Sequence, residues 1–341
     1  MTTLSILSII GGVLLFLFTF GDLFQTVFMI GGGAGPQSTY MARSTWKWAL
    51  NLHSTKSKRS HSMMRAVGPF IVLMALATWV LQLVLAWALI LVPTAFSDKD
   101  GVSFSDRLLF AAKSIIGRSG NSPEIRVIEG PWEIIESISG ITGVIVVTVG
   151  LAYVLPILGA VVAKRSVAAT IGTLGDDVDS MIRRATLPGG SSFELHLVAL
   201  ISSISEIAER HRSYPVLHYF HSKDSHAALA TSIAKLSLLL KSNRSDMDRV
   251  DPTVVEPLAH AIHNLLDALS IMGLKDFAHR DKRIDSNSLH QLNINPDQPP
   301  TTNRLPHSEW LKAYVLFDGW DWDAIRNGAE KTMEYLQNNS D

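Results

Sequence analysis

The sequence predicts an all-α polytopic membrane protein with three transmembrane helices, a re-entrant loop between the second and third, and a cytoplasmic helical domain. Three observations support this fold class. Long apolar runs occur three times before Arg165, and about 20 apolar residues suffice to cross a bilayer. A short amphipathic segment lies between the last two runs. Beyond Arg165 the chain is polar and has apolar residues at helical spacing.

Composition narrows the possible functions. The chain has 341 residues, a formal net charge of −1 and no cysteine. The near-neutral charge argues against a nucleic-acid-binding protein, and the absence of cysteine excludes disulfides and thiolate metal sites. No arrangement of a nucleophile and a base predicts an enzyme, and no pattern predicts a metal site or a bound cofactor.

The first predicted transmembrane helix covers residues 1–30 and carries one charged residue, Asp22. The run lacks the basic start and small-residue cleavage pattern of a signal peptide, so we expect a retained helix. A carboxylate at membrane depth is costly and usually faces protein or water. Asp22 therefore either packs against protein or lies near the interface at the helix end, and the sequence leaves both readings open.

Residues 31–65 form a basic segment with no Asp or Glu, and its cations are Arg43, Lys47, Lys56, Lys58, Arg59 and Arg65. By the positive-inside rule we expect this segment to be a cytoplasmic loop. The chain would then be a multi-pass protein of the inner (plasma) membrane, with its N-terminus outside and its C-terminus in the cytoplasm. Trp46 and Trp48 suggest an amphipathic stretch on the inner membrane surface. A short solvated connector is the alternative.

Residues 66–163 are predicted to form a pore module. Its second and third transmembrane helices are expected at Ala66–Ala95 and Ser137–Ala163, with a re-entrant pore loop at 101–125 between them. Irregular backbone at membrane depth occurs only where protein buries it or where it lines a water-filled cavity. We therefore expect the end of this loop to line an ion pathway and to form its selectivity filter. The residues concerned are Ser114, Ile115, Ile116, Gly117, Arg118, Ser119, Gly120 and Asn121.

Residues around the third transmembrane helix are predicted to support and gate the pathway. Glu133 and Glu136 share one helix face by their spacing and, with Lys113 of the loop, are expected to support the pore. The predicted gate consists of Gly150, Tyr153 and Pro156, because an internal proline removes a backbone donor and kinks a helix. Small residues in such helices also serve close packing, which is the competing interpretation.

Several motifs resemble the bacterial two-pore-domain potassium channel family, also called the ion-channel family. The matching residues are Asp22-x-x-x-Thr26, Gly33-x-Gly35-Pro36, Trp46, Glu136-x-x-x-Gly140, Tyr153-x-x-Pro156 and the run Ser213-Tyr214-Pro215-Val216-Leu217-x-Tyr219-Phe220 preceded by Glu209. The match extends over about residues 10–240. This resemblance implies four chains around one pore, a permeant monovalent ion (K⁺) and signature roles for Asp22, Thr26, Tyr214 and Pro215.

The loop departs from the filter of that family. A potassium filter has the form Thr-x-Gly-Tyr/Phe-Gly-Asp, whose carbonyls replace the ion's hydration shell. Here Gly117 and Gly120 are separated by two residues, Asn121 replaces Asp, and Arg118 lies inside the run. Unpaired cations at a narrow pathway oppose cation passage. The sequence therefore supports the presence of a pore module more strongly than it supports selectivity for potassium.

Residues 164–341 are predicted to form a cytoplasmic helical domain. Helices are expected at 178–185, 193–212, 227–241 and 254–272, and one more within the Trp-rich tail 310–336. His211, His218, His221 and His226 lie close in sequence, and His260 and His263 are three residues apart. Without supporting motifs these are expected to be solvated or core-edge histidines, with pH sensing as an option.

Two function classes follow. The first is a homotetrameric membrane ion channel of the potassium-channel type with a non-standard filter, gated by its cytoplasmic domain. The second is a non-conducting channel-like receptor or scaffold whose helical domain binds a partner or ligand. In both, the expected partners are membrane lipid and other copies of the chain, with a possible cytoplasmic regulatory ligand or protein.

Overall fold

The computed structural model describes residues 3–54, 58–93, 96–97, 102–117, 126–127, 131–186, 191–241, 251–285, 289 and 308–327. These residues are largely helical, as predicted, with one pair of two-residue strands that the prediction did not include. The chain divides into two compact units. The first consists of residues 1–29, 34–41 and 71–156, and the second of residues 30–33, 42–70 and 157–341.

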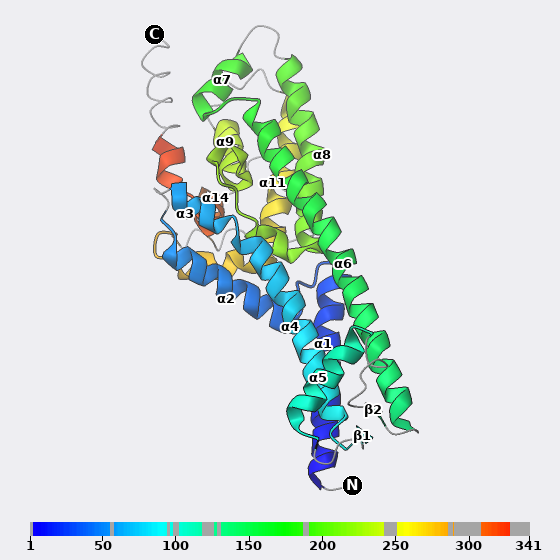
Figure 1. The fold of residues 1–341 in the computed structure, drawn as a ribbon. Helices are drawn as coiled ribbons and strands as arrows, with labels where there is room; N and C mark the ends of the chain where they lie inside the picture. Colours follow the sequence, from blue (N-terminus) through cyan, green and yellow to red (C-terminus); the bar gives the residue numbers. More distant parts are fainter. Residues whose placement is uncertain are drawn as a thin grey trace. The chain divides into compact units, whose positions relative to one another are not determined.

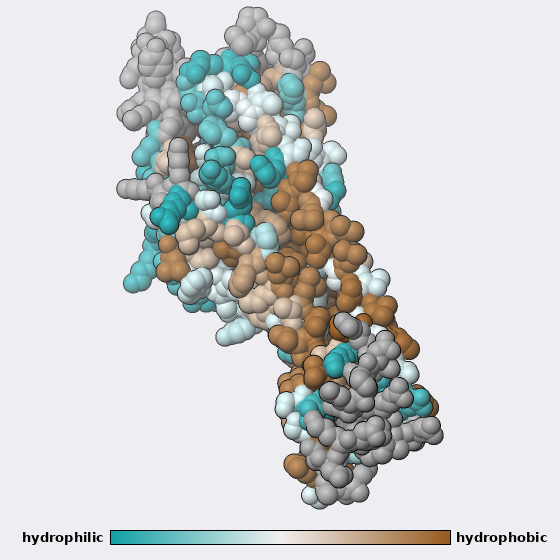
Figure 2. All heavy atoms as spheres, viewed as in Figure 1, coloured by the Kyte–Doolittle hydropathy of each residue, from teal (hydrophilic) through white to brown (hydrophobic). Residues whose placement is uncertain are grey.

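Three helices are long and apolar enough to cross a membrane (Figure 1). They are α1 (Thr3–Phe28), the segment Arg59–Ile90 that contains α4 (Val67–Ile90), and α6 (Pro131–Gly172). This confirms the three predicted spans, although α6 extends beyond both ends of the predicted third span. Figure 2 shows hydrophobic residues gathered along the apolar helices, where Leu14, Ile141 and Leu151 are exposed.

The first unit packs α1, α4, α5 (Phe104–Ile115) and the first part of α6 around one apolar core. Its buried residues are Leu23, Trp79, Leu83, Trp87, Ala88, Ile90, Ala111, Ile115 and Val146. The short strands β1 (Phe96–Ser97) and β2 (Arg126–Val127) pair antiparallel. This pairing brings together the two ends of the segment that contains α5.

The second unit is a helical assembly built largely from the C-terminal half of the chain. Its helices are the later part of α2 (Pro36–Leu52), α3 (Lys58–Met64), the end of α6, α7 (Val178–Thr186), α8 (Ser191–Ser213), α9 (Leu229–Lys241), α11 (Pro252–Leu269), α12 (Lys275–Arg280) and α14 (Ser308–Phe317). Short turns of 3₁₀ helix, η2 (Pro215–Tyr219) and η3 (Ser225–Ala227), separate α8 from α9. Pro215 accounts for the end of α8, since proline has no amide hydrogen to donate.

Two predicted helices are interrupted in the structure. The helix expected at 254–272 ends at Leu269 and continues as the π-turn η4 (Ser270–Leu274), where Gly273 has a φ of 109°. The single helix expected in the Trp-rich tail is wrong, because α14 ends at Phe317 and Gly319 adopts a φ of 82° before a new helical turn at 322–327. Glycine tolerates this backbone region without a steric penalty.

Candidate functional site

The short helix α5 begins with a complete capping box. The Ser103 side chain accepts a hydrogen bond from the Asp106 amide, and the Asp106 carboxylate accepts one from the Ser103 amide at 3.0 Å. Such a cap satisfies amide groups that the first helical turn leaves unpaired. Just beyond the other end of α5, Gly117 adopts a φ of 73°, so the chain turns away from the helix. The sequence thus encodes both ends of α5.

The C-terminal end of α5 packs closely against α6 in the first unit. A Cβ atom added to Gly143 would lie 2.0 Å from the Ile115 carbonyl oxygen, and one on Gly140 would lie 3.3 Å from that of Ser114. Any side chain at position 143 would therefore collide with the α5 backbone. Small residues commonly allow helices to approach closely in membrane proteins, and at these two glycines the approaching partner is α5.

Of the residues predicted to line the ion pathway, the structure describes those from Ser114 to Gly117. Ser114 and Ile115 are buried, whereas Ile116 is exposed and Gly117 forms the turn. The Ser114 hydroxyl has no hydrogen-bond partner among the described residues. The predicted pathway residues Arg118, Ser119, Gly120 and Asn121 lie outside the described residues.

The predicted supporting and gating residues lie on α5 and α6. Lys113 and Glu136 are half-buried, and Glu133 is exposed. Tyr153 is buried, and a Cβ atom at Gly150 would lie 3.0 Å from the Leu76 side chain of α4. Pro156 lies inside α6, which continues as a helix through it. Gly150 is therefore at a helix-packing position, which matches the competing interpretation of the small residues.

Asp22 is a buried hub of hydrogen bonds in the first unit. Its side chain is surrounded by protein, with only 2% of the residue exposed. Oδ1 accepts from the Gln37 amide at 2.8 Å and from the Ser38 amide, while Oδ2 accepts from the Ser38 hydroxyl at 2.5 Å and from Trp79 Nε1 at 2.9 Å. Of the two readings of Asp22, the structure supports the one in which it packs against protein.

Thr26 completes this arrangement one turn further along α1. Its hydroxyl donates to the Asp22 carbonyl at 2.6 Å and accepts from the Gly35 amide at 2.9 Å. A Cβ atom at Gly35 would lie 2.3 Å from Asp22 Oδ1, so only glycine fits there. Asp22, Thr26 and Gly35 of the two resembling motifs are therefore joined by close contacts, through which α1 holds the N-terminal turn of α2.

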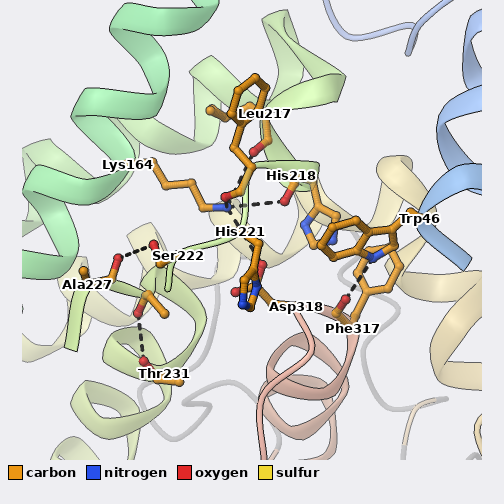
Figure 3. Close-up of polar contacts among 12 residues, drawn as sticks. Trp46, Lys164, Leu217, His218, His221, Ser222, Ala227, Thr231, Phe317 and Asp318 are labelled. Atoms are coloured by element: carbon orange, nitrogen blue, oxygen red, sulfur yellow. Dashed lines mark hydrogen bonds and ion pairs between the residues drawn. The ribbon is translucent and has the colours of Figure 1, made fainter. Parts of the chain in front are cut away.

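A second polar centre lies in the second unit, around Lys164 of α6 (Figure 3). The Lys164 ammonium donates to the carbonyl oxygens of Phe220 at 3.0 Å, His218 at 3.4 Å and Leu217 at 3.5 Å. These carbonyls lie at the end of η2, within the Tyr214–Phe220 signature. Tyr214 precedes η2 and Pro215 is its first residue. The signature thus presents its carbonyls to α6.

Asp318 provides the countercharge to Lys164. Its Oδ1 lies 3.9 Å from Lys164 Nζ, and at most 4% of either side chain is exposed. Burial raises the pKa of Asp318 to about 6, and the nearby Lys164 charge opposes that shift. The carboxylate is consequently ionised at neutral pH and forms a buried ion pair that connects α6 with the segment after α14.

Three buried histidines surround this ion pair. Burial lowers the pKa of His211 and of His221 to about 3, and that of His218 well below its usual value, with the Lys164 charge contributing in each case. His61 of α3 lies 2.9 Å from His221, Nδ1 to Nε2, and stacks on Trp320. The imidazoles of His211, His218 and His221 are therefore neutral and lie in the core of this unit, not at its solvated edge.

The buried histidine cluster corrects the expectation of solvated or core-edge histidines. His211, His218 and His221 are at most 4% exposed, while the side chain of His226 is largely exposed. In the described part of the chain, no group of three or more His, Asp or Glu side chains could hold a metal ion. His260 and His263 lie on α11 as predicted, and no metal group includes them.

Sequence reasoning missed Lys164 and Asp318. Lys164 directly follows the predicted third span, at a position where a cation is usually solvated. Asp318 lies in the Trp-rich tail, where no local pattern indicates a buried carboxylate. A weak signal existed, since Lys164 lies three residues before the buried Val167 on a helix that continues to Gly172. A cation on the apolar face of a helix needs a buried partner.

Comparison with known proteins gives one informative match. The chain is 26% identical over 238 residues to the uncharacterized membrane protein YdjJ of Bacillus subtilis (strain 168), and the match covers 67% of each chain. Together with the three apolar helices, this supports a membrane location. The chain is a membrane protein. No protein-family model and no solved structure matches it.

Proposed function

We propose that the chain is a pore-loop ion channel of the potassium-channel type with a non-standard filter. In this proposal four chains surround one pathway, and the C-terminal helical unit acts in the cytoplasm to gate it. The observation that carries the proposal is the placement of α5. It is a capped half-length helix that packs in one core with α1, α4 and α6, and the chain turns at Gly117 directly after it.

The surroundings of α5 support this role. Paired β1 and β2 bring the ends of the α5 segment together, so it forms a closed insertion between two candidate spans. Gly143 allows the backbone of α6 to approach that of Ile115. Irregular backbone next to such a helix is tolerated where it is buried by protein or lines a water-filled cavity. In the proposed tetramer, the exposed apolar face of α6 contacts lipid or neighbouring copies.

The second candidate function is a non-conducting channel-like receptor or scaffold. It is favoured by the run Gly117-Arg118-Ser119-Gly120-Asn121, whose spacing and cation differ from a potassium filter. Four copies of Arg118 facing one axis would oppose cation entry, because like charges in a narrow, poorly solvated space interact strongly. In this case the pore fold serves as architecture, and the helical unit binds a ligand or partner.

Ion flux into liposomes that contain the purified full-length protein distinguishes the two. The channel proposal expects cation flux above that of empty liposomes, and Arg118→Ala is expected to increase it if Arg118 faces the axis. Lys275→Ala, which removes an exposed cation of α12, serves as the control and should leave flux unchanged. Absence of flux in both the wild type and Arg118→Ala, with correctly folded protein, would support the receptor instead.

A further inference from the structure

A pocket of about 290 Å³ lies within the second unit, separate from the Lys164 centre. Its lining comes from α2, η2, the η4–α12 segment and the end of α14. Buried Trp46, Tyr219, Met272 and Phe317 line it together with charged side chains that are more exposed. An apolar cavity with a few convergent polar groups is the usual form of a small-molecule site.

Tyr219 supplies a hydroxyl group to the lining of this pocket. The residue is only 4% exposed, and its hydroxyl makes no hydrogen bond to another described residue. Burial raises the pKa of Tyr219 to about 12, so the hydroxyl keeps its proton at neutral pH. The hydroxyl of a tyrosine that lines a pocket can donate a hydrogen bond to an acceptor bound there.

The charges around the pocket leave an excess of positive charge. Both carboxylates that line it already have partners: Asp276 pairs with Arg43 at 3.2 Å, and Asp281 pairs with Arg283 at 2.6 Å. By contrast, Lys47 and Arg280 form no ion pair with a described residue. Two uncompensated cations therefore border a cavity that also contains a hydroxyl donor.

The apolar part of the pocket suits a flat ring. The indole of Trp46 is held by a hydrogen bond from Nε1 to the Phe317 carbonyl at 3.1 Å, and the rings of Phe277 and Phe317 lie 5.2 Å apart. Gly273 also lines the pocket, with a φ of 109°, and a Cβ atom there would be in ordinary contact with Arg43 Nε at 3.4 Å. Fixed aromatic side chains and a guanidinium group stack favourably on planar ligands.

We propose that this pocket binds a small organic anion that carries a flat ring. The anionic group contacts Lys47 and Arg280 and accepts a hydrogen bond from Tyr219, while the ring packs among Trp46 and Phe317. The inference rests on the lining of the pocket and does not depend on whether the chain conducts ions.

Isothermal titration calorimetry on the full-length protein in nanodiscs tests the proposal with two matched pairs of probes. Salicylate and AMP each carry a ring and an anion, and salicylamide and adenosine are their neutral counterparts. At least one anionic probe should bind with a Kd below about 1 mM, and its neutral counterpart at least about tenfold more weakly. Inorganic phosphate, an anion without a ring, should also bind more weakly.

Three variants connect binding to the pocket. Arg280→Gln, which removes the charge, and Tyr219→Phe, which removes only the hydroxyl, should each weaken binding by about three- to tenfold. Lys275→Gln removes an exposed cation from the same helix as Arg280 without lining the pocket, and should leave the Kd unchanged. The proposal is overturned if neither anion binds, if the neutral probes bind equally well, or if Lys275→Gln has the same effect as Arg280→Gln.

Discussion

Lys164 and Asp318 form a buried ion pair that connects a candidate membrane-spanning helix to the C-terminal part of the chain. Their charged atoms lie 3.9 Å apart, and neither side chain is more than 4% exposed. The ammonium also donates to three carbonyl groups at the end of η2, so its remaining hydrogen-bonding capacity is used. A buried cation persists only with such compensation, because removal from water costs several kcal/mol per ion.

Replacing Lys164 with methionine should strongly destabilise the second unit. The substitution keeps an unbranched side chain but leaves the Asp318 carboxylate buried without a countercharge, at an expected cost of about 3–5 kcal/mol. Thermal unfolding in detergent, monitored by tryptophan fluorescence, measures the effect. The neighbouring Arg165→Gln is the control, because Arg165 is exposed.

The double variant Lys164→Met/Asp318→Asn separates charge from packing. Removing the orphaned carboxylate should recover part of the stability that the single variant loses, since a neutral amide is less costly to bury than a charge. Equal unfolding temperatures for the single and double variants would show that the ion pair contributes little.

Acidification should destabilise the second unit below about pH 6.5. His211 and His221 have folded-state pKa values of about 3, so the unfolded chain binds protons that the folded chain does not, and stability falls as pH decreases from 6.5 toward 3. At pH 5.5 each histidine contributes a loss of about 1.4 kcal/mol. Asp318, with its raised pKa of about 6, acts in the opposite direction but with a gain of less than about 1 kcal/mol.

Unfolding temperatures measured between pH 7.5 and 5.5 check this pH dependence. His221→Gln should flatten the decline, because it removes one of the groups that must stay neutral. The exposed His226→Gln should not alter the slope. A stability profile that is flat, or that rises on acidification, would contradict the buried neutral histidines.

Gly143→Ala should disrupt the packing of α5 on α6. The added methyl group would lie 2.0 Å from the Ile115 carbonyl oxygen, so backbone must move, and overpacking of this kind costs about 1–3 kcal/mol or more. Gly159→Ala on the same helix is a matched control, because a Cβ atom there has no neighbour within 4 Å. Limited proteolysis between α4 and α6 measures exposure of the α5 segment, and similar cleavage of both variants would argue against the close contact.

Asp22→Asn should destabilise the first unit by about 2–4 kcal/mol. The carboxylate accepts from two backbone amides, a hydroxyl and an indole, and an amide in its place would direct its own donor hydrogens at one of these donors. Ser38→Ala removes one of these bonds and should have a smaller effect. Tryptophan fluorescence during thermal unfolding follows both variants, since Trp79 donates to Asp22. An Asp22→Asn variant as stable as the wild type would rule out the hub as a stabilising feature.

Local patterns predicted the three spans and most helices of the second unit, but not the interruptions at Gly273 and Gly319. The three apolar spans follow from their hydropathy, and the boundaries of α5 follow from the Ser103 capping box and from Gly117. The end of α8 follows from Pro215. In each case the determinant lies within a few residues of the feature, because capping, turn formation and membrane partition depend on neighbouring side chains and backbone.

Tertiary structure alone decided which polar residues are buried and with which partners. Asp22 meets Ser38 and Trp79, and Lys164 meets Asp318, across separations that no local pattern encodes. The same residue types are usually solvated, and the sequence favoured solvated or core-edge histidines. Burial changed their chemistry, since a charge or an imidazole removed from water must find a partner or stay neutral. The helices are therefore local properties of the sequence, whereas the two polar centres arise from packing.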